Sequence, residues 1–319
     1  MVYVGSSSQD ADVEDVDSKR KGELTNSRSE KGLIWANIVV ALAVHLFQAV
    51  FLALRANEHA VQLYVYYSGW RPADPNYGCF ETLPSGEKNV CTVIQTRTES
   101  TKISMKALTV GFFLLSFAFQ FLPMVLPGGR TAYLKFVRNG VQAFRYVEYS
   151  ISASLMVMQF GVLVGVDDVN VILQLFWASA ATMILGLCAD AIDYYQRKAD
   201  IVRSSFAATF IRVVPAYTAW NVFVFQWIFV GGRFVYSISA GTTAPKELYA
   251  IVILEFLAFL SFGINAALAS ANVIGRVTSE WVYIALSAVA KTILAEILFL
   301  SYAMRNTDYL KYGPMCPAS

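Results

Sequence analysis

The stretch SEWVYIALSAVAKTILAEILFL, residues 279–300, decides the fold class of this chain. It is long and apolar enough to cross the ~30 Å hydrocarbon layer of a membrane as a helix, which takes roughly 20 residues. Hydrophobic residues make up 56% of the 319 residues and charged residues only 15%, far from the balance of a soluble domain. The sequence therefore predicts an integral membrane protein surrounded by lipid.

Six further runs resemble this stretch in length and apolar character. Together they predict seven spans, near residues 33–54, 107–126, 141–166, 169–193, 206–230, 248–271 and 280–304. Runs of this length bond their backbone internally as helices, unlike the ~10-residue alternating strands of a membrane barrel. We therefore expect an all-α membrane protein in which residues 32–305 form a single seven-helix bundle.

The two ends of the chain are predicted to lie on opposite sides of the membrane. Residues 1–31 are polar and of mixed charge, which predicts a disordered tail. Lysine and arginine gather before the first span and between spans two and three, four and five, and six and seven, and such residues favour the cytoplasmic side. We expect a cytoplasmic N-terminus and an extracellular C-terminal tail at residues 306–319.

The long connection at residues 55–106 falls on the extracellular side in this topology. LYVYYSGW and CTVIQTRTES are rich in β-branched and aromatic residues and flank the turn-forming LPSGEKN. We expect a small extracellular β-hairpin in this loop between the first two helices. Cys79 and Cys91 bracket the turn, and either a disulfide or two free thiols fits the sequence.

Lys291 is the unusual residue of the quoted stretch. A charged side chain at mid-bilayer costs at least ~2.5 to 3.5 kcal/mol, so it indicates function by default. Lys291 lies about eleven residues, roughly 16 Å, from either end of its helix, which is too far to snorkel to the interface. It must face the interior, either as a structural lysine paired with a buried carboxylate or as an amine that forms a Schiff base with an aldehyde.

Neighbours of Lys291 favour the Schiff base. Ser287 lies one turn before it, on the same face, and can instead bond back to its own helix. Small residues nearby leave room for a ligand: Ala288, Ala290 and Ala295.

A protonated Schiff base also needs a nearby carboxylate as counterion. Glu148, with Arg145 one turn earlier, is the candidate in the third span. Glu255 and Glu296 compete for the role, but Glu296 is rotated about 140° away from Lys291 on its own helix.

These motifs carry a family resemblance. RYVEYSISAS at residues 145–154 and SEWVYIALSAVAK at residues 279–291 resemble the heliorhodopsin family, as do the inside N-terminus and the long loop after the first span. The resemblance covers roughly residues 33–304. It implies all-trans retinal on Lys291, Glu148 as sole counterion, and Ser287 beside the Schiff base.

The resemblance further implies a histidine in each of the first two spans near the Schiff base. His45 matches the first of these, but the second position is Gln120 in LSFAFQFL, which puts histidine-to-histidine proton handling in doubt. The family is typically dimeric, so a homodimer is expected on that ground alone.

A planar polyene also calls for large rings and adaptable side chains around it. Met156 and Phe262 are the candidates that we favour. Each of the other candidates is more typical of lipid-facing or packing positions: Trp177, Tyr217, Trp220, Phe223, Trp227 and Phe259.

Three function classes follow. First comes a photosensor that passes retinal isomerisation to an unknown signalling partner. Second comes a light-gated proton channel or transporter, although Gln159 stands where outward pumps carry a second carboxylate. Third comes a retinal- or lipid-modifying enzyme or an enzyme regulator. We find no nucleophile with its base, no metal-ligand spacing, no phosphate loop and no sign of nucleic-acid binding, so we expect a protein that is not an enzyme.

Overall fold

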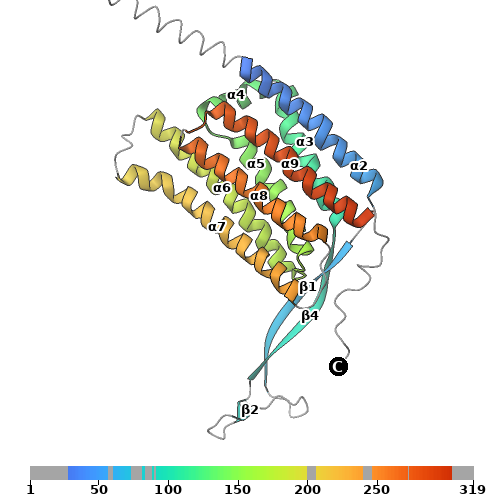
Figure 1. The fold of residues 1–319 in the computed structure, drawn as a ribbon. Helices are drawn as coiled ribbons and strands as arrows, with labels where there is room; N and C mark the ends of the chain where they lie inside the picture. The colour runs from blue at the N-terminus through green and yellow to red at the C-terminus, as the bar shows by residue number, and fades with distance from the viewer. Residues whose placement is uncertain are drawn as a thin grey trace, which may run out of the picture.

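The computed structural model is a bundle of long helices with a two-stranded ribbon at one end (Figure 1). It describes residues 28–56, 60–72, 81–82, 88–89, 91–199, 206–239, 246–271 and 273–303. The first helix runs from Arg28 to Arg55 and contains a π-helical turn, η1 (Ala41–Leu46), followed by α2 (Phe47–Arg55). The later helices are α3 (Met105–Val125), α4 (Gly129–Asn139), α5 (Ala143–Leu163), α6 (Val169–Lys198), α7 (Phe206–Ser239), α8 (Lys246–Ser270) and α9 (Arg276–Ala303).

Five helices of the described chain are long and apolar enough to cross a membrane. They are the first helix, α3, α6, α7 and the Leu248–Ser270 part of α8. Helices α5 and α9 lie at the residues predicted for the other two spans but are not among these five, and both carry charged residues that are buried. The protein is therefore an integral membrane protein of mainly helical structure.

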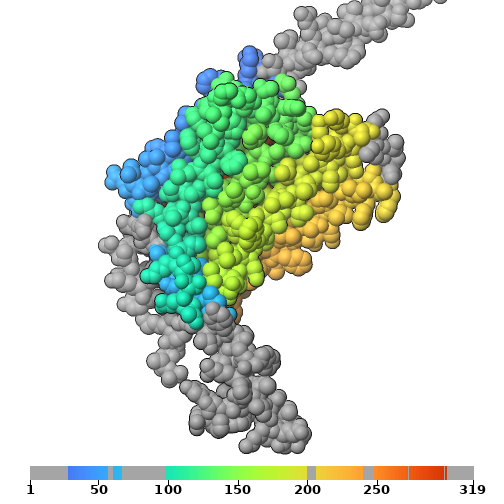
Figure 2. Space-filling view, turned by 180° about the vertical axis from the view of Figure 1, so that it is seen from behind, coloured from blue at the N-terminus to red at the C-terminus, as the bar shows by residue number. Residues whose placement is uncertain are grey.

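Helices that follow one another in sequence are mostly neighbours in space. From behind, the colours run in order from the first helix through α3 and α6 to α7 across the bundle (Figure 2). Helix α5 packs against both α3 and α6, and α8 packs against α9. Because α9 also contacts η1, the last helix returns to the first, and side chains of α5 and α9 face each other inside the bundle.

Helix α4 is absent from the sequence prediction, which treated its basic residues as part of a connection. Gly128 and Gly140 flank it with φ of 76° and 71°, left-handed values that glycine adopts without strain. Tyr133 and Val137 turn inward from it and are buried. Its amphipathic pattern is too short for a span, so composition alone did not separate it from a loop.

The predicted boundary of the N-terminal tail is also wrong by a few residues. Residues 28–31 already belong to the first helix. Glu30 explains this, because its buried carboxylate accepts hydrogen bonds from Arg138 Nε at 2.7 Å and from Arg138 Nη2 at 2.6 Å. The remainder of the predicted tail lies outside the described residues, as does the C-terminal tail.

The expected β-hairpin is present and longer than predicted. Strand β1 (Ala60–Pro72) pairs antiparallel with β4 (Cys91–Ser104), and the short strands β2 (Glu81–Thr82) and β3 (Lys88–Asn89) form a second ladder. The ribbon extends from the end of the bundle at which α3 begins (Figure 1). Whether Cys79 and Cys91 form a disulfide or stay as free thiols falls outside the described side chains.

The base of the hairpin is fixed to the bundle. Tyr64 donates its backbone N–H to the Asp167 carbonyl at 2.8 Å, and the Tyr66 hydroxyl donates to Asp167 Oδ2 at 2.7 Å. Asp167 lies in the turn that joins α5 to α6. These bonds hold the first strand against the end of the bundle.

Candidate functional site

Lys291 lies at the centre of the bundle and is only 2% exposed. Its Nζ is 2.9 Å from Glu148 Oε1 on α5 and 2.9 Å from Ser287 Oγ on its own helix. The ring of Tyr149 lies beside it, with Nζ 5.0 Å from the ring centroid. The amine therefore sits among a carboxylate, a hydroxyl and an aromatic face, and the first two belong to the residues that the sequence motifs named, Glu148 and Ser287.

Arg145 joins this pair to a second buried carboxylate. Its Nε donates to Glu280 Oε1 at 2.9 Å, whereas its Nη1 is 3.4 Å from Glu148 Oε2. The arginine thus bonds more closely to Glu280 than to Glu148. This leaves Glu148 Oε1 directed at Lys291.

Two neutral side chains complete the network around Arg145 and Glu280. Asn37 of the first helix accepts from Arg145 Nη2 at 2.8 Å and donates to the Tyr133 hydroxyl at 2.9 Å. Tyr133 in turn donates to Glu280 Oε1 at 2.7 Å. Burial, and next the charge of Glu280, raise the pKa of Tyr133 well above its usual range, so the hydroxyl keeps the proton that it donates.

The four charged groups of this cluster balance. Arg145 and Lys291 supply two positive charges, and Glu148 and Glu280 supply two negative ones. All four residues are at most 3% exposed. Because an unbalanced charge at this depth is costly, the cluster favours a nitrogen at position 291 that keeps its proton.

His45 and Gln120 are both buried, at 0% and 1% exposure. His45 lies in η1, and π-turns of this kind are frequent at functional sites. Neither ring nitrogen of His45 and neither amide atom of Gln120 has a hydrogen-bond partner among the described residues. The π-helical turn η1, which carries His45, contacts both α3, which carries Gln120, and α9, which carries Lys291.

The two competing acids lie in different surroundings from Glu148. Glu296 Oε1 accepts a hydrogen bond from Gln48 Nε2 at 2.7 Å, away from Lys291 as its helical rotation predicts. Glu255 of α8 is fully buried, and neither of its oxygens has a partner in the described part of the chain.

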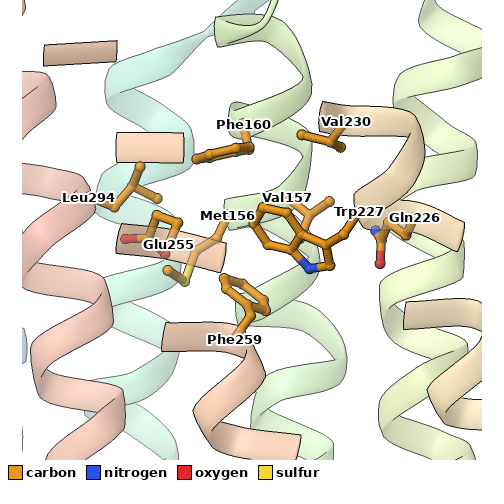
Figure 3. Close-up of a pocket in the computed structure, with 9 residues that line it drawn as sticks. All are labelled: Met156, Val157, Phe160, Gln226, Trp227, Val230, Glu255, Phe259 and Leu294. Carbon is orange, nitrogen blue, oxygen red and sulfur yellow. The ribbon is translucent and has the colours of Figure 1, made fainter. Parts of the chain in front are cut away.

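A cavity opens between α5, α7, α8 and α9 (Figure 3). Leu294, three residues after Lys291 on α9, is part of its wall. Met156 lines it, as the sequence analysis expected. The other lining residues are Val157, Phe160, Gln226, Trp227, Val230, Glu255, Phe259 and Leu294. Trp227 packs its ring against Phe160 and Phe259, with centroids 5.4 and 5.6 Å apart.

Phe262 is not among the residues that line this cavity. Its ring instead packs edge-on against Tyr149 at 5.2 Å and stacks on Tyr283 at 6.0 Å. It therefore supports the aromatic ring beside Lys291. Trp177 and Tyr217 are 65% and 67% exposed on the outside of the bundle, where lipid surrounds them.

Sequence reasoning missed Glu280 and Tyr149. The spacing of Glu280 could have identified it from the sequence. It precedes Lys291 by eleven residues, about three turns, and so lies on the same face of the helix. Tyr149 follows Glu148 directly, and nothing in its spacing marked it as facing the lysine.

Comparison with known proteins places the chain in a family. A search of curated proteins gives no significant match. The family model described as Heliorhodopsin matches residues 33–302, which is most of the chain. Such a match over a helical membrane protein with a buried lysine in its last helix establishes the family, and the chain belongs to the heliorhodopsins.

Proposed function

We propose that the protein is a light receptor that binds all-trans retinal through a protonated Schiff base on Lys291, with Glu148 as the counterion. The family implies the retinal chromophore, and the proposal concerns how this chain holds it. The observation that carries it is the buried contact of 2.9 Å between Lys291 Nζ and Glu148 Oε1.

The residues around Lys291 fit a retinal. A desolvated lysine amine is the group that condenses with an aldehyde. The adjoining cavity is lined mainly by apolar and aromatic side chains, which suit a planar polyene. Bound retinal supplies absorption of visible light and isomerisation.

Each side chain has a defined part in this arrangement. Glu148 stabilises the positive charge on the Lys291 nitrogen, because two opposite charges at this distance strongly favour the charged form. Ser287 accepts a hydrogen bond from the free amine, and its hydroxyl lies beside the single N–H that a protonated Schiff base keeps. Glu280 holds Arg145, so that the arginine does not neutralise Glu148 completely.

The proposal includes a topology of seven spans. Helices α5 and α9 would be the two spans that carry the site, since each is long enough to cross the bilayer and each buries its charged groups inside the bundle. The clustering of basic residues supports a cytoplasmic N-terminus. A homodimer in the membrane is part of the proposal by family resemblance.

We propose signalling without steady ion transport. Arg145 lies beside the counterion, and a fixed cation disfavours the passage of another cation. A light-gated proton channel is the second candidate, favoured by the buried carboxyl group of Glu255. The two candidates differ in whether a proton that leaves the Lys291 nitrogen crosses the membrane or returns.

Difference spectroscopy tests the retinal assignment. Protein made without retinal should gain a red-shifted visible band when all-trans retinal is added, and Lys291→Ala protein should show only free retinal. A native band in the variant would remove Lys291 from the site.

A further inference from the structure

Glu255 is a buried carboxyl group that the proposed receptor site does not use. It is 0% exposed, and both of its oxygens lack a hydrogen-bond partner within the described ranges. Figure 3 shows its side chain among the residues that line the cavity. The other lining residues include no cation. Glu255 therefore holds its proton, since an unpaired charge is costly at this depth.

A protonated carboxyl group has an O–H that donates and a C=O that accepts. Buried polar groups are nearly always hydrogen-bonded, so two unused positions on one side chain call for an occupant. Trp227 is a second side chain with an unused hydrogen-bonding group, because its Nε1 is buried and has no acceptor in the part of the chain that is described. Gln226, by contrast, already donates to the Leu175 carbonyl at 2.9 Å.

The rest of the cavity wall is apolar, which excludes most other occupants. Met156, Phe259 and Leu294 offer no strong hydrogen bond, and no positive charge is present to hold an anion. A hydroxyl group both donates and accepts, as Glu255 requires. We infer that Glu255 forms a hydroxyl-binding position inside the apolar cavity, filled by the hydroxyl of a ring-hydroxylated retinal or by an ordered water.

This inference rests on the proposed function, because the cavity begins one turn from Lys291 on the same helix. Leu294, which lines it, follows Lys291 by three residues. If retinal occupies this space, Glu255 helps to decide which retinal is preferred.

The test compares all-trans retinal with all-trans-3-hydroxyretinal on the full-length protein. We expect the hydroxylated aldehyde to bind about 2- to 12-fold more tightly in competition, the range that one net hydrogen bond provides. Glu255→Leu should remove this preference, and Glu255→Gln, which keeps a donor and an acceptor, should retain part of it. Phe259→Leu is the matched control from the same cavity and should weaken both aldehydes by the same factor.

Infrared spectra give a readout that does not depend on light response. The C=O stretch of the protonated Glu255, identified by its loss in Glu255→Gln, should move when the hydroxylated aldehyde replaces retinal. If the two aldehydes bind equally but a water O–H band disappears in Glu255→Leu, an ordered water supplies the hydroxyl group that Glu255 binds. The inference then holds, with water as the occupant.

Equal binding, together with no such water band and an unshifted C=O stretch, would overturn the inference. Failure of the proposed function looks different: neither aldehyde would then attach to Lys291 at all.

Discussion

Replacing Glu148 by glutamine removes the negative charge that faces the Lys291 nitrogen. At 2.9 Å and an effective dielectric constant of about 20, the attraction between the two charges is about 6 kcal/mol, or about 4 pH units of protonation. The glutamine carbonyl can still accept a hydrogen bond from the cation, which restores about 1.5 to 3 kcal/mol. The nitrogen of the retinal-loaded variant should therefore lose its proton about 2 to 3 pH units lower than in the parent protein.

The assay is a spectral titration of both proteins with bound retinal. Where the nitrogen keeps its proton, the Glu148→Gln band should lie at longer wavelength, because the lost carboxylate stabilised the ground state more than the excited state. Where the proton is lost, the band should move to the near-ultraviolet. Glu296→Gln is the control and should titrate like the parent, since that carboxylate contacts Gln48 instead. An unchanged Glu148→Gln spectrum and titration would refute the reasoning and transfer the counterion role to Glu255.

Three further outcomes follow from the buried contacts. Glu280→Gln should lower the free energy of unfolding by about 3 to 5 kcal/mol in thermal or denaturant unfolding, because Arg145 loses its closer carboxylate; stability equal to that of the parent would contradict the network. Arg138→Ala should lower the free energy of unfolding by about 1 to 3 kcal/mol, because it leaves the Glu30 carboxylate buried without its partner. Lys135→Ala, on the exposed face of α4, is the control and should change the free energy of unfolding little. Equal effects of the two substitutions would exclude a special part for Arg138. Under voltage clamp, illuminated cells should show no steady photocurrent at any holding potential; a sustained current that reverses with the proton gradient and disappears in Glu255→Gln would instead support the channel.

The pairing of Lys291 with Glu148 could be predicted from the sequence because it follows from features within single apolar segments. A lysine in the middle of an apolar run cannot reach water, so it must meet a buried acid, and few acids lie inside apolar runs. Glu148 and Ser287 followed from that constraint and from helical spacing, and both lie 2.9 Å from Lys291 Nζ. The hairpin followed equally from strand and turn composition.

The rest depends on how helices rotate and tilt against one another, which composition does not fix. Phe262 and Trp227 were both aromatic candidates, but only Trp227 lines the cavity, because the orientation of each helix decides which ring faces inward. Helix α4 was not predicted for another reason, because its basic residues indicated a loop. The structure shows that Tyr133 and Val137 on its inner face are buried. The ion pair of Glu30 with Arg138 joins segments far apart in sequence, and no local pattern indicated it.

Covalent attachment at Lys291 is the central claim and can be measured directly. The full-length protein is incubated with all-trans retinal in the dark, treated with borohydride to reduce the C=N bond, digested, and mapped by mass spectrometry. We predict a retinyl group on Lys291 alone, and none on the Lys291→Ala protein. An adduct on another lysine of the parent protein, or a visible pigment with no adduct at Lys291, would contradict the account.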